Sequence, residues 1–309
     1  MILTVTLNPS VDRTLFVARL SPHETNRVTK TETDAGGKGV NAARVLKELG
    51  QEVCAAGFLG GGPGAFVRSV LDREGVSHSF VEVGGDTRLN VLIEEESGGP
   101  PTTLNERGPE IRNEEWEALR ASVVAVSKEA HAVVFGGSVP PGLPPSAIAE
   151  LVRAVRRDSL IVAVDCEGDA LRLAIDERPD IIKPNGSEAS AILGVSVSTP
   201  SEAAEAARRL LDMGVGSPIV SIGALGAGVA TKDGAWFAKP PRIEARSTIG
   251  SGDSLLAGYV CGVLDGLSPA ESLRLGTAAG AATAMTSGAE IGRRDTIRSL
   301  VGRVTIENV

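Results

Sequence analysis

The sequence predicts an α/β fold in which a mainly parallel sheet is covered by helices on both faces. Short apolar, β-branched runs alternate with stretches of helical period. Strands separated by helices form βαβ units, whose strands run parallel and are buried on both sides. Ligands of such sheets bind beyond the carboxyl ends of the strands. The expected strands are 2–7, 53–58, 132–135, 160–164, 180–182 and 218–222, and the expected helices are 40–49, 65–74, 114–126, 146–156 and 202–211.

Two segments interrupt this alternation and are expected to form a small lid. Residues 12–33 carry no helical period and are typical of two extended, half-polar strands. Residues 88–107 are typical of a hairpin, with strands 89–95 and 102–106 and a Gly- and Pro-rich turn at 97–101. Neither segment has enough apolar surface for a core of its own. We therefore expect a single domain spanning all 309 residues, with these lid strands inserted in it.

The last third of the chain predicts two helices that pack closely. Six apolar residues between positions 255 and 264 fall on one stripe of a helix. Its Gly258 and Gly262 weaken a helix, so they are expected where a neighbouring element approaches closely. Small residues dominate a second helix, which runs from Ser268 to about residue 285.

Composition and charge exclude several classes of protein. The net charge of −8 argues against a nucleic-acid-binding protein, whose surface would carry a basic face. The three cysteines stand far apart in apolar runs and form no zinc-binding spacing, which favours a reduced, cytoplasmic protein. The first residues lack a basic region and a cleavage site, and no apolar run reaches about 18 residues. We therefore expect a soluble protein with neither a nucleic-acid nor a membrane partner.

The sharpest motif is STIGSGDS at residues 247–254, which opens the first of these two helices. Gly250, Ser251 and Gly252 would present successive backbone N–H groups at a helix N-terminus, where unpaired donors and the helix dipole attract anions. Asp253 adds a carboxylate directly beside this anion site. An ordinary helix cap is the alternative. A carboxylate beside a phosphate site, however, suits a base that takes a proton from a hydroxyl attacking that phosphate.

Three glycines and a lysine precede the first long helix, in DAGGKGVN at residues 34–41. The motif is not a Walker A loop, because Gly39 follows the lysine where Ser or Thr is required. An ordinary strand-to-helix turn is the alternative. Lys38 and Asn41 favour instead a site where a polar ligand lies against the backbone.

The expected lid and the first strand carry further candidate ligand-binding groups. In TRLN at 87–90, the period of two places Arg88 and Asn90 on one face. A guanidinium beside an amide suits a phosphate or sugar hydroxyls. Asp12 follows the first strand at the carboxyl end of the sheet. A solvated surface arginine and a turn-forming aspartate are the alternatives for Arg88 and Asp12.

The segment IKPNGSE at residues 182–188 predicts a helix start with two alternative roles. Asn185 would cap a helix over 186–193, and Glu188 stands three residues after the cap, as in a capping box. Alternatively, Lys183, Asn185 and Glu188 bind a nucleotide phosphate, directly or through Mg²⁺ and its waters.

In this order, the motifs resemble those of the PfkB (ribokinase-like) carbohydrate kinase family. The resemblance spans nearly the whole chain and is closest to the phosphosugar branch, which includes 1-phosphofructokinases and tagatose-6-phosphate kinases. The matching segments are TLNPSVD at 6–12, AGGKGVN at 35–41, TRLN at 87–90, GGSVPPG at 136–142, KPN at 183–185 with Glu188, the glycine loop at 221–228, and GSGD at 250–253.

This resemblance implies a three-layer α/β/α sandwich with a β-sheet lid that pairs two subunits into a homodimer. Asp253 would be the catalytic base, with the amides of Gly250, Ser251 and Gly252 as an anion hole. Ser251 departs from the family, which usually has Ala there, but it leaves the backbone amide in place. The implied sugar-phosphate ligands are Asp12, Gly37, Lys38, Asn41, Arg88, Asn90 and Ser138, and the implied ATP ligands are Lys183, Asn185, Glu188, Ser221, Gly223 and Gly226, with Mg²⁺ near Glu188 and the ATP phosphates.

The implied reaction transfers the γ-phosphoryl group of ATP to a hydroxyl of a ketohexose monophosphate, with Mg²⁺ as cofactor. Fructose 1-phosphate, converted to fructose 1,6-bisphosphate, is the expected substrate. Lys38 and Arg88 would also serve tagatose 6-phosphate or fructose 6-phosphate. A non-catalytic nucleotide or sugar sensor is a remote alternative, because it would be expected to lose the base or the anion hole. A nicotinamide-dependent dehydrogenase requires GxGxxG after the first strand, and this chain has NPSVD there.

Overall fold

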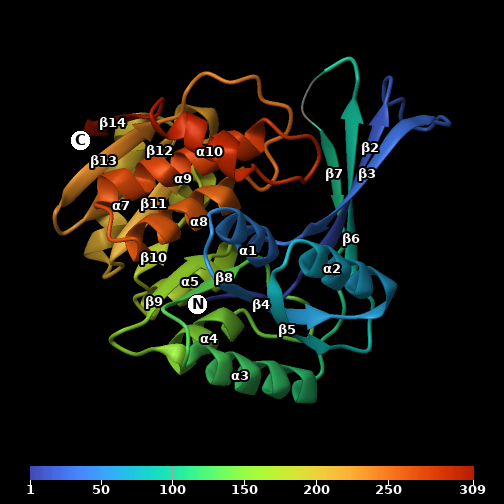
Figure 1. The fold of residues 1–309 in the computed structure, drawn as a ribbon, viewed down its shortest axis with the longest axis horizontal. Coiled ribbons are helices and arrows are strands. Elements are labelled where there is room, and N and C mark those ends of the chain that lie inside the picture. The colour runs from blue at the N-terminus through green and yellow to red at the C-terminus, as the bar shows by residue number, and fades with distance from the viewer. Residues whose placement is uncertain (99–100) are drawn as a thin grey trace.

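The computed structural model describes residues 1–98 and 101–309, and a sheet of ten strands forms its centre (Figure 1). The strands are β1 (Ile2–Thr6), β4 (Val53–Leu59), β5 (Ser77–Glu82), β8 (Ala132–Gly136), β9 (Ile161–Asp165), β10 (Ile181–Ile182), β11 (Ser217–Ser221), β12 (Ala227–Thr231), β13 (Gly234–Lys239) and β14 (Thr305–Asn308). Their order is β14-β13-β12-β11-β10-β9-β8-β1-β4-β5. Neighbours run parallel from β11 to β5 and antiparallel from β11 to β14, which confirms the mainly parallel sheet.

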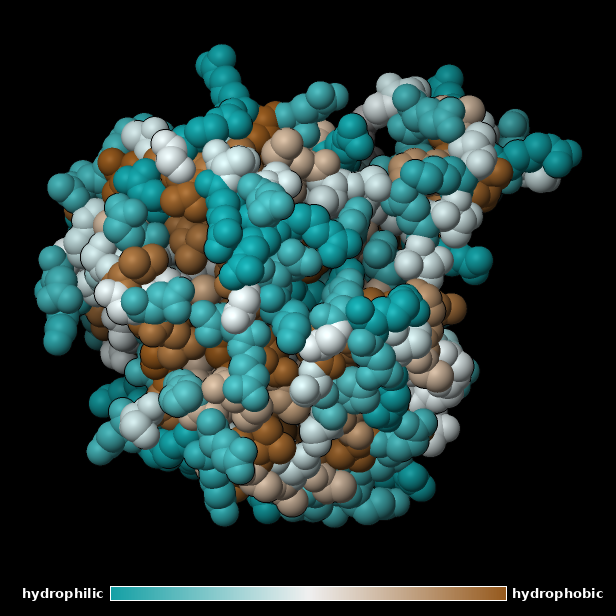
Figure 2. All heavy atoms as spheres, in the orientation of Figure 1, coloured by the Kyte–Doolittle hydropathy of each residue, from teal (hydrophilic) through white to brown (hydrophobic). Residues whose placement is uncertain are grey.

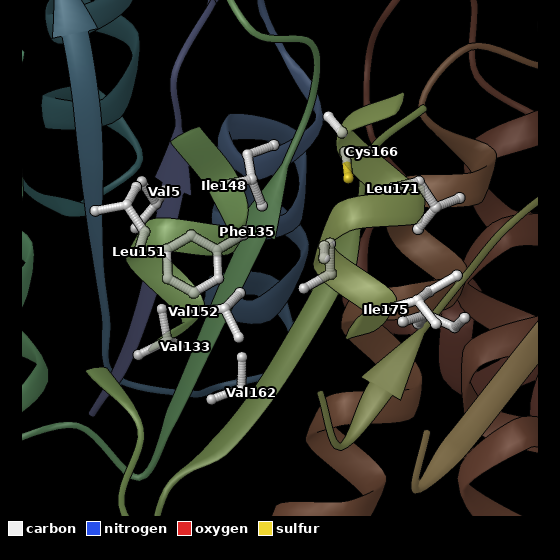
Figure 3. Close-up of a cluster of buried hydrophobic side chains, with 14 of the residues drawn as sticks. Val5, Val133, Phe135, Ile148, Leu151, Val152, Val162, Cys166, Leu171 and Ile175 are labelled. Atoms are coloured by element: carbon white, nitrogen blue, oxygen red, sulfur yellow. The ribbon is translucent and has the colours of Figure 1, made fainter. Parts of the chain in front are cut away.

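Helices cover both faces of this sheet, because successive strand residues point to opposite sides. Leu3 and Val5 of β1 pack into one cluster of buried side chains, part of which Figure 3 shows, while Ile2 packs into a second cluster. Helices of the first face are α3 (Asn113–Ser127), α4 (Ala147–Val155), α5 (Gly168–Asp176), α6 (Gly186–Leu193) and α7 (Pro200–Asp212). Helices of the second face are α1 (Lys38–Glu48), α2 (Gly61–Arg73), α8 (Ser251–Leu264), α9 (Pro269–Ala284) and α10 (Arg294–Val301). The predicted three-layer sandwich is confirmed.

A separate sheet of four strands forms the lid, and it stands away from the body at one corner (Figures 1 and 2). Its strands are β2 (Ser10–Val17), β3 (Val28–Gly36), β6 (Arg88–Glu95) and β7 (Thr102–Asn105), in the order β3-β2-β6-β7. The two predicted lid segments are therefore joined through a parallel pairing of β2 with β6. The expected turn at 97–101 includes residues 99 and 100, which lie outside the described part of the chain.

The expected elements are confirmed, with shifts of a few residues at their ends, but β5, the antiparallel edge, α5 and α10 were not predicted. β5 is partly exposed along its length, so it lacks the continuous apolar run of a buried strand. The β12–β13 hairpin turns over Lys232 and Asp233, directly before Gly234. An Asp-Gly pair is a known hairpin signal, and it was available in the sequence.

The prediction of one apolar stripe on α8 was wrong, because this helix is buried on nearly all sides. Its residues from Asp253 to Gly262 are buried, since α8 lies between α1 and α9. The close approach expected at its glycines is confirmed: a Cβ on Gly258 would lie 2.7 Å from the Cα of Gly276. A Cβ on Gly262 would lie 2.8 Å from the Cα of Ser272. Packing between backbones therefore replaces the polar face that a surface helix would have.

Two further predictions concern the whole chain. In the part of the chain that the structure describes, no helix is long and apolar enough to cross a membrane. Cys54, Cys166 and Cys261 are buried and form no disulfide with one another.

Candidate active site

Five charged or polar side chains meet at the carboxyl edge of the main sheet, in front of the start of α8. Asn41 of α1 donates a hydrogen bond from Nδ2 to Oδ2 of Asp253, over 2.9 Å. Lys38, at the start of the same helix, donates to Oδ1 of Asp165, the last residue of β9, over 2.7 Å. Lys183 follows β10 and lies 2.9 Å from Oδ2 of Asp165. We call Asp253, Asp165, Lys38 and Lys183 the charged cluster.

The first turn of α8 presents backbone N–H groups to this cluster. Gly250 is the N-cap, and its left-handed φ of 71° favours glycine. The N–H of Ser251 donates to the carbonyl of Thr248 over 3.3 Å, whereas those of Gly250 and Gly252 have no backbone acceptor among the described residues. A Cβ on Gly252 would lie 3.2 Å from Nζ of Lys183. The helix start thus combines free N–H donors with an ammonium group, an arrangement that suits a phosphate.

Burial and a neighbouring carboxylate make Asp253 an unusually weak acid. The side chain is buried, and desolvation followed by the negative charge of Asp165 raises its pKa to about 6. The hydrogen bond from Asn41 and the charges of Lys38 and Lys183 oppose this rise in pKa. The carboxylate is still mostly ionised at neutral pH and can accept a proton, because a base works best with a pKa near the working pH.

The charged cluster is held together by Asp165. Burial favours the neutral form of this carboxyl, but Lys183 and Lys38 hold its pKa below the usual value. Burial likewise favours a neutral Lys38, but the charge of Asp165 raises the pKa of that ammonium. Asp165 and Lys38 therefore carry opposite charges at neutral pH.

A second group of predicted residues lies where the lid joins the body. Asp12 accepts hydrogen bonds at Oδ1 from the Ser10 hydroxyl over 2.7 Å and from Asn90 Nδ2 over 2.9 Å. A Cβ on Gly36 would lie 2.2 Å from Oδ2 of Asp12, so only glycine fits there. Burial raises the pKa of Asp12 despite these hydrogen bonds. The turn-forming alternative for Asp12 is wrong, because the residue lies within β2.

Arg88 is partly buried at the same junction, and it is not a freely solvated surface arginine. Its Nε donates to the carbonyl oxygen of Asn8 over 3.2 Å, and Nη1 donates to that of Glu106 over 3.1 Å. Asn8 in turn donates from Nδ2 to the hydroxyl of Ser138 over 3.1 Å. The structure thus links Arg88 to Ser138 through a residue that sequence reasoning did not select.

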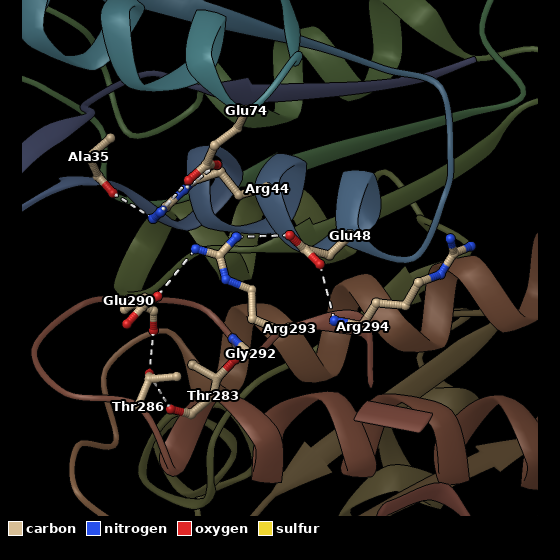
Figure 4. Close-up of polar contacts among 10 residues, drawn as sticks. All are labelled: Ala35, Arg44, Glu48, Glu74, Thr283, Thr286, Glu290, Gly292, Arg293 and Arg294. Carbon is tan, nitrogen blue, oxygen red and sulfur yellow. Dashed lines mark hydrogen bonds and ion pairs between the residues drawn. The ribbon is translucent and has the colours of Figure 1, made fainter. Parts of the chain in front are cut away.

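Helix α1 joins these two groups, and ion pairs at Arg44 and Glu48 hold it in place (Figure 4). Gly37 is its N-cap, with a φ of 106°, and it connects the lid-root Gly36 to Lys38. Arg44 is buried and pairs with Glu74 over 2.8 Å at both guanidinium contacts. At the other end of the helix, Glu48 accepts from Arg293 over 3.0 Å. These contacts tie α1 to its neighbours and so position Lys38 and Asn41.

The residues expected to bind the nucleotide form a third group. Two of them, Asn185 and Glu188, form the capping box that was the alternative interpretation of this segment. Asn185 accepts from the N–H of Glu188 over 2.9 Å, and Glu188 accepts from the N–H of Asn185 over 2.8 Å. The predicted helix over 186–193 is confirmed as α6. Asn185 also pairs with Ser221 in an isolated β-bridge. The box leaves Oε1 of Glu188 and Nδ2 of Asn185 outside its two bonds.

The glycines of the 221–228 loop have different structural demands. Gly223 has a φ of 60° and faces open space, so a ligand can approach it. Gly226 has a φ of 124°, and a Cβ there would lie 2.0 Å from the carbonyl oxygen of Ala238. Close packing against β13 is therefore sufficient to explain glycine at position 226.

The residues fit a magnesium ion that is held mainly by phosphates and water. Among the described residues, no three His, Cys, Asp or Glu side chains form a metal-binding group. Mg²⁺ commonly keeps several waters and takes only one or two carboxylates besides substrate phosphates. Glu188, with its second carboxylate oxygen outside the capping box, is compatible with that role.

Sequence reasoning missed Asp165 and Asn8. Asp165 is the last residue of β9, one position beyond the predicted strand 160–164. Its place at the carboxyl end of a buried strand was a usable signal.

A surface hollow of about 270 Å³ also lies beyond β8 and β9, between Ser138 and Glu167.

The fold and this edge of the sheet define the class as an α/β phosphotransferase, and comparison with known proteins identifies the family. The model of the pfkB family carbohydrate kinases matches residues 5–296. The chain is 33% identical to a 1-phosphofructokinase of Bacillus subtilis, with 99% of each chain covered. It is 38% identical to a 1-phosphofructokinase of Haloferax volcanii, covering 89% of this chain and 88% of the relative.

Solved structures agree with this result. The phosphofructokinase-2 of Escherichia coli, in complex with substrates and products, has a TM-score of 0.92 at 28% identity and 98% coverage of both chains. A ribokinase of Thermotoga maritima has a TM-score of 0.76 at 20% identity, covering 97% of this chain and 99% of that one, and shares the fold. The chain belongs to the pfkB family of carbohydrate kinases, and it is a sugar phosphotransferase.

Proposed function

We propose that this enzyme transfers the γ-phosphoryl group of ATP to fructose 1-phosphate and produces fructose 1,6-bisphosphate. The observation that carries the proposal is the buried Asp253 carboxylate, hydrogen-bonded to Asn41 at the N-terminus of α8, with two ammonium groups in the same cluster. Full-length relatives named 1-phosphofructokinase support the choice of acceptor.

Asp253 acts as the general base in this proposal. Its carboxylate takes the proton of the C6 hydroxyl while that oxygen forms a bond to the γ-phosphorus. The bond from the γ-phosphorus to the bridging oxygen breaks, and ADP leaves with the electron pair. Phosphoryl transfer passes through a loose transition state, so positioning and charge stabilisation account for most of the acceleration. The free amides at Gly250 and Gly252 would stabilise the charge on the transferred group.

The sugar phosphate is held from two sides in this proposal. Asp12 and Asn90 at the lid root bind sugar hydroxyls, and Arg88 supplies a partly desolvated cation for the existing phosphate. The remaining sugar-side residues are Gly37, Lys38, Asn41 and Ser138.

The nucleotide binds on the side of α6 and the 221–228 loop. The phosphates are bound by Lys183, Asn185 and Glu188. The rest of the nucleotide site is lined by Ser221, Gly223 and Gly226. Mg²⁺, held by Glu188 and by ATP through water, supplies Lewis-acid neutralisation of the phosphate charge when bound.

Fructose 6-phosphate and tagatose 6-phosphate are the competing acceptors. The Escherichia coli neighbour, whose structure is also known in complex with fructose 6-phosphate, favours the first of them at 27% identity. A non-catalytic sensor is disfavoured, because the base and the free amides of α8 are both present.

An ADP-release assay with four sugars tests the assignment. Fructose 1-phosphate, fructose 6-phosphate, tagatose 6-phosphate and unphosphorylated fructose are compared side by side at saturating MgATP. The expected result is the highest kcat/KM with fructose 1-phosphate and almost none with fructose. A higher kcat/KM with either 6-phosphate would reassign the substrate.

Three further parts of the proposal concern the number of domains, the oligomeric state and the cellular location. We propose that all 309 residues form one kinase domain with an inserted lid, and that the lid pairs two subunits into a homodimer. Leu104 on β7 is 58% exposed and supports such pairing. Light scattering of the Leu104→Asp variant tests it, with a monomer as the expected product. The three buried, unpaired cysteines support a cytoplasmic location.

A further inference from the structure

Asp165 is the most deeply buried charge of the site, and the proposed chemistry gives it no role. Its side chain is 2% exposed and lies between Nζ of Lys38 at 2.7 Å and Nζ of Lys183 at 2.9 Å. Placing a carboxylate in such a position costs stability unless it is paired. A well-packed apolar residue would satisfy the end of a buried strand at lower cost. The carboxylate at position 165 is therefore more simply explained by a role in the site than by a contribution to stability.

The two lysines come from different parts of the fold, and Asp165 is their shared contact. Lys38 starts α1, while Lys183 follows β10. The Lys183 ammonium lies beside the α8 N-terminus, 3.2 Å from the place of a Cβ on Gly252. The Lys38 side chain is 31% exposed, so a ligand can approach it.

We propose that Asp165 is a positioning residue. It holds the Lys38 and Lys183 ammonium groups at the N-terminus of α8, where both contact the phosphoryl group during its transfer. This inference rests on the proposed kinase function and adds a residue to it. Lysine is a flexible point charge on a long stem, and without an anchor its ammonium samples many positions. A buried anion that contacts both ammonium groups removes that freedom before substrate binds. The remaining donors of each ammonium stay available for phosphate oxygens.

The same arrangement couples Asp165 to the base. Asp253 is faced by Asn41 and Lys38 from α1, by Asp165 from β9 and by Lys183 from the segment after β10. Removing the charge of Asp165 removes a repulsion and frees two cations, and both changes favour the ionised form of Asp253. The pKa of Asp253 must therefore fall below its value of about 6 in an Asp165→Asn variant.

The test compares Asp165→Asn with the wild-type enzyme. We expect kcat to fall by about tenfold to a hundredfold, because the lysines lose alignment. KM for ATP should change less, because their charges remain. The fall of kcat/KM on the acid side of the pH profile (its acid limb) should occur at a pH about one unit lower. An unchanged kcat, or an acid limb that stays near pH 6 in a folded variant, would overturn the inference.

A readout without turnover separates this inference from the proposed function. The carboxyl carbon of Asp253, assigned by its loss in Asp253→Asn, is titrated by ¹³C NMR in the free protein. A downward shift of its midpoint in Asp165→Asn supports the coupling even if fructose 1-phosphate proves to be the wrong substrate. An unchanged midpoint contradicts the coupling even if the kinase assay succeeds.

Two further variants cover the case in which Asp165→Asn does not fold. Lys183→Met should raise the titration midpoint of Asp253, because a cation is lost. Adding Asp165→Asn to it should lower this midpoint again, since the double variant restores the balance of charges in the cluster. Equal midpoints in these two proteins would refute the inference. Glu115→Gln is the matched control, because Glu115 on α3 is also a buried carboxylate and is paired with Arg112, the N-cap of that helix. It should lower stability and leave both kcat and the Asp253 midpoint unchanged.

Discussion

The main sheet and the lid sheet both contribute residues to the candidate site, but they hold those residues in different ways. All five residues of β1 are buried, and so are four of five in β9, which ends at Asp165. In the lid, all four residues of β7 are exposed, and β3 becomes buried only at its last two residues. In these outer strands burial is thus confined to the root, where Asp12 meets Asn90, while the inner strands β2 and β6 also bury Thr14, Val17 and Leu92.

This difference separates a preorganised part of the site from an adaptable one. The charged cluster is fixed by packing on both faces of the main sheet, so its geometry is set before any ligand arrives. The lid is more exposed than the main sheet, most of all along β3 and β7, and such regions open at lower free energy than a core. Chemistry should therefore depend on the cluster, and affinity for the sugar should depend on the lid root.

Removing the base is the largest test of the cluster. Asp253→Asn preserves the shape of the side chain but cannot accept the proton, so kcat should fall by about 10²- to 10⁴-fold. Nucleotide binding, measured by calorimetry, should remain within a few-fold of wild type. Near-normal turnover would remove Asp253 from the base role and end the distinction between the two regions.

A substitution at the lid root should affect binding instead. Arg88→Ala removes a charged donor, and KM for the sugar phosphate should rise by about tenfold to a hundredfold. KM for ATP should change much less. Arg13→Ala is the matched control, because Arg13 lies on the neighbouring lid strand and is exposed. Equal increases in both KM values would place Arg88 outside the sugar site.

The pH profile sharpens the same comparison. Burial and the Asp165 charge raise the pKa of Asp253 from 3.8 to about 6, so the base becomes protonated as pH falls through that value. The kcat/KM should therefore decline by about tenfold per pH unit below pH 6 and level off above pH 7. Asp253→Asn should lack this limb in its residual activity. A wild-type profile that stays flat down to pH 5 would contradict the assignment.

The smallest predicted effect concerns the packing that holds α8. A Cβ on Gly258 would lie 2.7 Å from Gly276, so Gly258→Ala should lower the free energy of unfolding by about 1–3 kcal/mol. Gly62→Ala is the control, because Gly62 is an exposed helix residue with nothing within 4 Å of its Cβ position. It should be neutral or stabilising in the same urea titration. Similar losses in both variants would show that α8 and α9 tolerate a wider separation.

The predictions from sequence succeeded where local pattern and local chemistry coincide. The periods of strands and helices sufficed for the layers, and the capping residues sufficed for α6, which begins directly after Asn185. Prediction failed for β5 and for the polarity of α8, because both depend on which element lies alongside. A half-exposed edge strand has a weak pattern, and a helix buried between two others has no polar face to reveal its period.

By itself, the sequence determined the α/β class and the positions of the lid strands, and it indicated the groups that we propose for phosphoryl transfer. Side-chain chemistry and periodicity are properties of short segments, so they can be read without a fold. Only the tertiary structure decided that Asp165 stands between Lys38 and Lys183 and beside Asp253. These four residues are far apart in the chain, and the distances that set their charges arise only when β9, β10, α1 and α8 pack at one edge of the sheet.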